Sequence, residues 1–174
     1  MATAEILETT QYLTFTLDGE EFALDISKVR EVLDYTAITM VPRMPDYLRG
    51  VINLRGNVVP VVDLRMKLGM AATEKTVNTC IVIVDVNMGG ENMQMGALAD
   101  SVQEVLELDA KQIEPAPRIG AGIRSEFLRG MGKKDDKFII ILDIDRVLST
   151  DEIGELQEVR NAEEDAVQEK LEVA

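Results

Sequence analysis

Residues 47–51 read Tyr-Leu-Arg-Gly-Val, and residues 127–131 read Phe-Leu-Arg-Gly-Met. In the same way, residues 59–65 (Val-Pro-Val-Val-Asp-Leu-Arg) return as residues 139–145 (Ile-Ile-Ile-Leu-Asp-Ile-Asp), again 80 positions later. A sequence that repeats at one fixed offset indicates two copies of one structural unit. The repeat therefore predicts two similar subdomains that pack side by side.

The repeat extends upstream at a slightly smaller offset. Residues 29–33 (Val-Arg-Glu-Val-Leu) return as residues 102–106 (Val-Gln-Glu-Val-Leu), 73 positions later, and the Pro-Arg pair at 42–43 returns at 117–118. The change of offset is what loops of different length in the two copies would produce. Each copy therefore spans roughly 70 residues, the typical size of a very small domain.

Alternating apolar residues and tight-turn signals predict five short strands in each copy, so we expect an all-β fold of two tandem five-stranded β-barrels, each closed or nearly closed. The expected strands cover residues 13–17, 21–25, 29–33, 48–53 and 58–62, and then 79–87, 93–98, 102–108, 128–131 and 137–142. Residues 63–69 and 143–149 are expected to form short helical turns, each begun by a capping aspartate.

These elements predict one folded region at residues 11–150, followed by an acidic tail. The first barrel is expected at about 11–75 and the second at about 79–149, with an exchange of strands at their junction left open. Residues 151–174 carry a narrow apolar stripe and are expected to form a C-terminal helix. Their nine acidic and two basic residues give this tail a net charge of −7, half of the −14 of the chain.

Composition excludes several classes of function. An acidic chain repels phosphate backbones and anionic lipid, so neither nucleic acid nor direct membrane insertion is expected. Without histidine, the chain has no Ser-His-Asp mechanism and no His-ligated metal, and no phosphate-binding loop is present. We therefore expect no enzyme activity, catalytic residue, metal site or cofactor. A single cysteine, Cys80, suits a reducing cytoplasm.

The stretch from Pro45 to Arg65 resembles the signature of the CheW family of bacterial chemotaxis coupling proteins. Residues 22–32, 112–117 and 127–130 resemble further segments of that family, and the resemblance extends over about Gln11 to Leu148. It implies two SH3-like barrels with an apolar groove between them. It also implies a non-enzymatic adaptor that joins the cytoplasmic tip of a chemoreceptor to the regulatory domain of the histidine kinase CheA, and is recruited to receptor arrays at the membrane.

The resemblance also implies positions for the receptor-binding groove, whereas it assigns no kinase-contacting residue. Arg55 is the expected anchor and Glu31 its expected neighbour; the alternatives are that Arg55 only flanks a turn and that Glu31, echoed by Glu104, is architectural. The weaker candidates belong to the groove and its rim, and for the valines core packing is the alternative. They are Val29, Asn53, Gly56, Gly96, Val102 and Val105.

Two other functions are compatible with the same residues. The first is a regulatory CheW-like module of a larger signalling protein, since the same pair of barrels occurs in the kinase itself. The second is a β-barrel that binds a small ligand, which the lack of metal ligands and phosphate loops disfavours.

Overall fold

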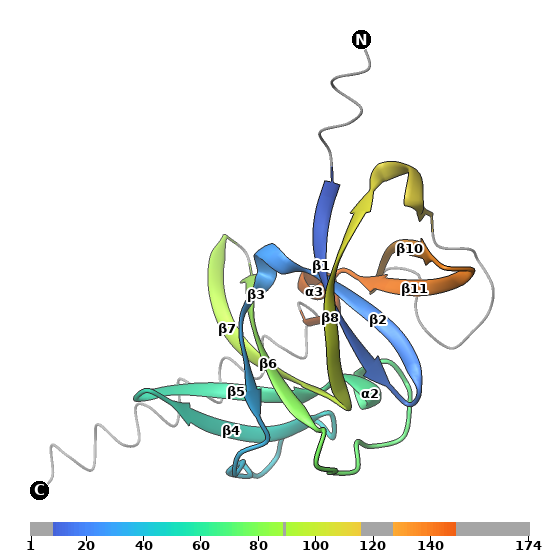
Figure 1. The fold of residues 1–174 in the computed structure, drawn as a ribbon. Helices are drawn as coiled ribbons and strands as arrows, with labels where there is room; N and C mark the ends of the chain where they lie inside the picture. Colours follow the sequence, from blue (N-terminus) through green and yellow to red (C-terminus); the bar gives the residue numbers. More distant parts are fainter. Residues whose placement is uncertain (1–8, 89, 116–126, 149–174) are drawn as a thin grey trace, which may run out of the picture.

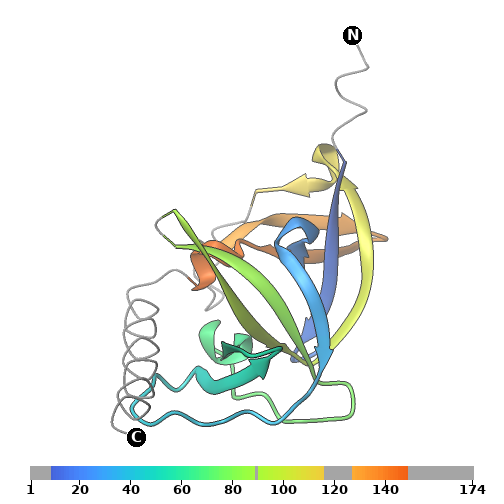
Figure 2. The same cartoon turned by 90° about the vertical axis from the view of Figure 1, so that its left-hand side faces the viewer.

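The computed structural model describes residues 9–88, 90–115 and 127–148, and these form two curved β-sheets (Figures 1 and 2). The first copy of the repeat supplies β1 (Thr9–Leu17), β2 (Glu20–Asp25), the 3-10 turn η1 (Ile26–Lys28), β3 (Val29–Asp34), β4 (Leu48–Leu54), β5 (Asn57–Asp63) and α2 (Leu64–Lys67). The second copy supplies β6 (Cys80–Met88), β7 (Glu91–Ala99), β8 (Ser101–Asp109), the 3-10 turn η2 (Ala110–Gln112), β9 (Ile113–Glu114), β10 (Leu128–Lys134), β11 (Lys137–Leu142) and α3 (Ile144–Leu148).

The all-β prediction is confirmed, and every expected strand and helical turn has a counterpart. The repeat holds at the level of register. The β4–β5 hairpin and the β10–β11 hairpin each shift register at a bulge, between Leu48 and Gly50 and between Leu128 and Gly130. The expected C-terminal helix at 151–174 lies outside the described residues.

The two sheets do not follow the two halves of the sequence. One sheet has the strand order β8-β1-β2-β11-β10-β9, and the other has the order β3-β6-β7-β5-β4. The first two strands of each copy therefore join the later strands of the other copy: β1 and β2 join β8 to β11, and β6 and β7 join β3 to β5. The expected division near residues 75–79 is not a boundary between sheets, and the exchange that the sequence left open is reciprocal.

Each sheet curls around its own apolar cluster, which makes it a barrel. In the first sheet (barrel A), Tyr12, Ala23, Leu108, Ile139 and Ile141 form the interior, with Ile113 of the edge strand β9 packed against them. In the second sheet (barrel B), the interior is formed by Ile52, Leu54, Val59, Val61, Ile81, Ile83 and Leu98, with Leu33 of the edge strand β3. Because the edge strands of each sheet reach the same cluster, each sheet closes on itself.

The largest apolar cluster lies between the barrels. It includes Leu13, Phe15 and Phe22 of barrel A together with Val82 and Met95 of barrel B. Phe15 and Phe22 are fully buried and their rings stack with centroids 6.0 Å apart. The barrels therefore share a core, which we call the inter-barrel core, and neither barrel is an independent unit.

Gly50 is the tightest backbone position in barrel B. Its φ is +142°, which L-residues with a side chain rarely adopt, and a Cβ there would overlap the carbonyl oxygen of Thr39. Thr39 exchanges two backbone hydrogen bonds of 2.9 Å with Val51, so this oxygen cannot move away easily. The β3–β4 connection is held against β4 at this point.

We predict that Gly50→Ala lowers the free energy of unfolding by at least ~2 kcal/mol, since backbone strain and steric overlap act together. Urea denaturation followed by circular dichroism measures this loss. Gly19→Ala is the matched control, because Gly19 has φ +81° but open space around its Cβ position. Equal midpoints for the two variants would contradict the steric part of the argument.

Candidate functional site

Glu31 and Arg55 form an ion pair on the surface of barrel B. Glu31 lies on β3, and Arg55 lies in the turn between β4 and β5. Both guanidinium Nη atoms donate to the carboxylate, Nη2 to Oε1 at close range and Nη1 to Oε2 at 3.5 Å. The Arg55 side chain remains 71% exposed. The pair therefore presents an oriented cation to solvent rather than a buried structural link.

The β4–β5 turn fixes where Arg55 projects. Arg55 and Gly56 have φ of +50° and +86°, as expected for the central residues of a type I′ hairpin turn. The side chain of Asn53 closes the turn, because its Oδ1 accepts a 2.8 Å hydrogen bond from the Gly56 amide. Asn53 and Gly56 therefore act on Arg55 through the backbone of the turn.

The positive charge of Arg55 does not depend on pH in any ordinary range. The hydrogen bond that Arg55 donates to Glu31, followed by the charge of that carboxylate, raises the pKa of Arg55 above its already high value. The guanidinium thus stays protonated, and an anionic or carbonyl-rich partner would meet a permanent donor. The expected pairing of Glu31 with Arg55 is present in the structure.

Val29 and Val102 lie at corresponding places in the two barrels. Val29 is the first apolar residue of β3, and Val102 is the first apolar residue of β8. Both are half-buried and pack against the inter-barrel core. Val105, further along β8, is 49% exposed. The expected groove valines thus divide into two that line the junction of the barrels and one that faces solvent.

Gly96 packs against the interior of barrel B. It is buried on β7, where a Cβ would come within 2.8 Å of the Cγ2 of Ile81 and 3.3 Å of the Cγ2 of Val61. Both neighbours belong to the interior of barrel B. Packing inside the barrel therefore accounts for this glycine, and the approach of a partner backbone is not required.

The Glu31–Arg55 pair has an equivalent on barrel A. Glu104 of β8 accepts a hydrogen bond from the Nζ of Lys134, at the end of β10. The glutamate therefore recurs as the sequence suggested, and its ion pair bridges the third strand and the last hairpin in both barrels. The contact of Glu31 with Arg55 thus also links β3 to the β4–β5 hairpin, which is an architectural role.

Asp63 and Asp143 are structural, as the sequence indicated. Asp63 is fully buried and caps α2, accepting a 3.0 Å hydrogen bond from the Arg65 amide. It also accepts from the amide and hydroxyl of Thr73, at 2.9 and 2.7 Å. Asp143 accepts from the Arg146 amide at 3.3 Å. These partners leave both carboxylates committed to helix starts.

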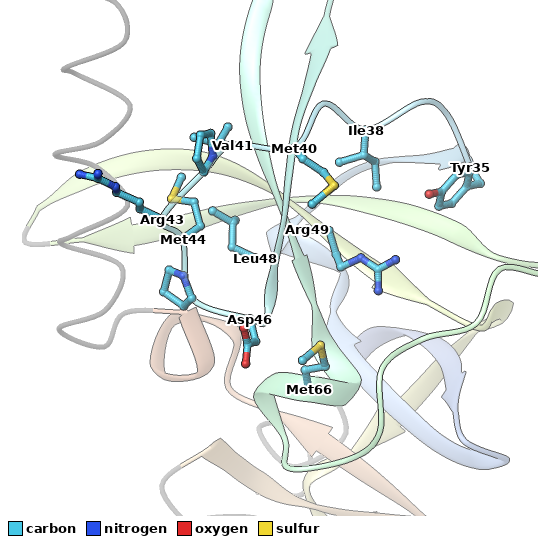
Figure 3. A pocket seen from close by; sticks show the side chains of 12 residues that line it. Tyr35, Ile38, Met40, Val41, Arg43, Met44, Asp46, Leu48, Arg49 and Met66 are labelled. Atoms are coloured by element: carbon cyan, nitrogen blue, oxygen red, sulfur yellow. The ribbon is translucent and has the colours of Figure 1, made fainter.

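A methionine-lined hollow of about 620 Å³ lies beside the β3–β4 connection (Figure 3). Met40, Met44 and Met66 surround it together with Leu48 and Arg49. Met44, Leu48 and Met66 also belong to or pack against the inter-barrel core, so the hollow opens onto that core. Flexible thioethers suit a surface that adapts to different apolar side chains.

Sequence reasoning missed this hollow, and it also missed two ion pairs that join the barrels, Arg65–Asp100 and Lys28–Asp145. The repeat contained a signal for the two ion pairs, because it aligns Arg65 with Asp145, a change of sign at an equivalent position.

In the part of the chain that the structure describes, no group of acidic or cysteine side chains could hold a metal ion. Within the same residues, no helix is long and apolar enough to cross a membrane.

Cys80 lies at the start of β6, and its Sγ donates a 3.1 Å hydrogen bond to the carbonyl of Asn78. Burial is the main cause that raises the pKa of this thiol, and the nearby charge of Asp34 acts in the same direction. The thiolate fraction at neutral pH is therefore lower than that of a free cysteine.

We predict that Cys80 reacts with maleimide more slowly in the folded chain than in the chain unfolded by urea. Because only the thiolate reacts, the rate of the folded chain should rise about tenfold for each pH unit below the raised pKa. Stopped reactions analysed by mass spectrometry measure both rates. Equal rates in the folded and unfolded chain at pH 7 would refute the raised pKa.

Comparison with known proteins places this geometry in a family. Residues 11–152 match the CheW-like domain model. The chain is 37% identical to the chemotaxis protein CheW of Klebsiella aerogenes over 83% of its own length and 84% of that protein, and 34% identical to CheW of Rhizobium meliloti over 82% and 89%. The crystal structure of the scaffolding protein TtCheW from Thermoanaerobacter tengcongensis superposes with a TM-score of 0.74 at 34% identity, covering 82% of this chain and 94% of that one.

The expected fold and the resemblance are thus confirmed. The chain belongs to the CheW family of non-enzymatic scaffold proteins that serve as coupling proteins in chemotaxis signalling.

Proposed function

We propose that this chain joins the cytoplasmic tips of chemoreceptors to the regulatory domain of the histidine kinase CheA. We place the receptor contact on the barrel B side of the junction between the barrels, with Arg55 as its anchor. The observation that carries this proposal is the exposed guanidinium of Arg55, held by Glu31 at the tip of a rigid type I′ turn. A cation fixed in this way loses little conformational entropy when it binds a carboxylate.

The apolar part of the contact is supported by Val29 and Val102. Both are half-buried against the inter-barrel core, from opposite barrels, so a helix laid along the junction could cover apolar surface from both. Asn53 and Gly56 support the site by shaping the turn that holds Arg55. We assign the chain to the cytoplasm, at receptor arrays, as a consequence of this role.

We predict that Arg55→Glu weakens receptor binding about tenfold, the effect expected for loss of a central charged anchor. In a reconstituted assay with receptor-containing membranes and the kinase, this variant should fail to raise autophosphorylation. Arg30→Glu is the matched control, since Arg30 is an exposed arginine on β3 that pairs with Asp85 at 2.6 Å. The unfolding midpoints of both variants should stay near that of the native chain.

A charge swap separates the two roles of Arg55. Arg55→Glu combined with Glu31→Arg restores an ion pair between the strand and the turn but reverses the exposed charge. If Arg55 is a receptor anchor, the swap stays inactive. Full recovery of receptor-dependent kinase activation would show that only the ion pair matters, and would overturn the proposed anchor.

For the kinase contact, we propose the surface around Phe138 on barrel A. Phe138 is 52% exposed on β11 and lines a hollow of about 430 Å³ with Met131, Ile140 and Gly19. Exposed aromatic side chains beside a hollow are typical anchors of protein–protein contacts. Figure 1 shows β11 on the part of barrel A that lies away from β4 and β5, so both partners could bind at once.

We predict that Phe138→Asp weakens kinase binding by about tenfold or more while receptor binding is unchanged, because the anchor is lost and a charge is placed in an apolar contact. Titration of the labelled kinase regulatory domain measures this affinity. Val77→Asp is the control, since Val77 is fully exposed at a different place. Equal kinase affinities of the two variants would show that Phe138 is not part of the kinase contact.

A further inference from the structure

Two ion pairs join the barrels at equivalent places, where the second strand of each copy passes into the third. In the first, the Nε of Arg65 on α2 donates to Asp100, the residue between β7 and β8, at 3.0 Å from Oδ1. In the second, the Nζ of Lys28 at the end of η1 donates to Asp145 on α3 at 2.8 Å. We call these the Arg65 clamp and the Lys28 clamp.

Each clamp carboxylate also accepts a backbone hydrogen bond from a first hairpin, Asp100 from that of the first copy and Asp145 from that of its own, second copy. Asp100 accepts from the Asp18 amide at 2.7 Å, and Asp145 accepts from the Asn87 amide at 2.9 Å. Asp18 follows β1 of the first copy, while Asn87 lies near the end of β6 of the second copy. Each clamp is therefore made of one carboxylate, one cation and one hairpin amide, although Asp145 is contributed by the helix and Asp100 by the strand junction.

The two clamps have opposite polarity. The repeat aligns Arg65 with Asp145, so the helix carries the cation in one clamp and the anion in the other. At the strand junction the order is reversed, with Asp100 in one and Lys28 in the other. At the offset of 73, Lys28 aligns with Ser101, the neighbour of Asp100, so the two junction residues correspond in space but are one position apart in the repeat. Opposite signs at corresponding sites distinguish two copies whose apolar pattern is nearly the same.

Because the two copies exchange strands, the opposite polarity of the clamps affects which copies can pair favourably. Each barrel is completed by the other copy of the repeat, so α2 meets the junction of the second copy and α3 meets that of the first. If the same copy from a second molecule completed a barrel instead, Arg65 would face Lys28 and Asp145 would face Asp100. Both contacts would then join like charges, and both carboxylates would lose their cations.

We propose that Arg65, Asp100, Lys28 and Asp145 are positioning residues that select which copy of the repeat completes each barrel. They favour pairing of unlike copies within one chain and disfavour pairing of like copies between chains. They also determine the walls of the junction, because Val29 directly follows Lys28 and Val102 lies two residues after Asp100. This inference goes beyond the proposed function and depends only on the fold.

The shielding of the Arg65 clamp supports a role in specificity. Its side chains are only 17% and 19% exposed, so the pair interacts more strongly than a fully solvated one, and its loss would leave polar groups without partners. In some folds, buried polar groups fix one pairing among alternatives with similar apolar patterns, as a single buried asparagine does in coiled coils.

The test is refolding of full-length variants from urea at several protein concentrations, with light scattering on a sizing column to give the dimer fraction. Asp100→Lys makes the native contact with Arg65 repulsive, and its melting temperature should fall by ~2–4 °C. The double variant Arg65→Asp with Asp100→Lys restores attraction within the chain. It also gives both clamps the same polarity, so like-copy pairing becomes attractive.

We expect the double variant to recover the melting temperature but to refold with a dimer fraction about tenfold above that of the native chain. Adding Lys28→Asp and Asp145→Lys makes the two polarities opposite again, and this fourfold variant should return to the native dimer fraction. A merely structural ion pair would restore stability in the double variant without changing the dimer fraction.

A native dimer fraction in the double variant would overturn the proposal, as would an unchanged melting temperature in Asp100→Lys. If the fourfold variant does not fold, Arg65→Gln with Asp145→Asn provides the second arm. It removes attraction within the chain and repulsion between like copies while keeping hydrogen-bonding groups, so its dimer fraction should also rise. A fraction equal to that of the native chain would again reject the selection of copies by charge.

Discussion

The short link between the second and third strand of each copy is the constraint on which the rest of the structure depends. In both sheets the third strand lies beside a first strand, two places from the second strand that it would follow in a continuous barrel. Two strand spacings are about 9.6 Å. Asp100 alone connects β7 to β8, and three residues of a 3-10 turn, which rises about 6 Å, connect β2 to β3. These links are too short to span two strand spacings within one sheet. The third strand of each copy therefore enters the other barrel.

Several features follow from this crossing. Because each copy contributes to both barrels, the largest apolar cluster forms between them, and the barrels cannot separate without exposing Phe15, Phe22 and Met95. The crossing also places Val29 and Val102 at the start of β3 and β8, against that shared core. A shared, close-packed core has low compressibility and transmits strain, so it connects the surfaces of the two barrels rigidly.

The sequence predicted the elements better than their partners. Alternation along residues 13–17 and the aspartates at 63 and 143 identified strands and helix starts, since both signals act within a few residues. The exchange could not be deduced, because the two copies share one apolar pattern and that pattern fits either set of partners. The environment of Gly96 could not be deduced for a related reason. A glycine in a strand indicates that another group comes close to it, but only the structure shows that these groups are the side chains of Ile81 and Val61. The pairing of Glu31 with Arg55 was anticipated as a contact between neighbouring segments.

The proposed function depends more on the differences between the two copies than on their likeness. The third-strand glutamate is paired in both barrels, yet it meets an arginine in a type I′ turn on barrel B and a lysine on barrel A. A planar guanidinium can hold a carboxylate by two bonds in a fixed orientation, whereas an ammonium acts as a point charge that its flexible stem does not orient. In the same way, Val58 on barrel B is replaced by the larger Phe138 on barrel A at the equivalent position. Duplication alone would yield two surfaces that compete for the same partner. Because these positions have diverged within one shared frame, the chain can present two different surfaces at once, and the role that we propose for it, between a receptor and a kinase, requires that combination.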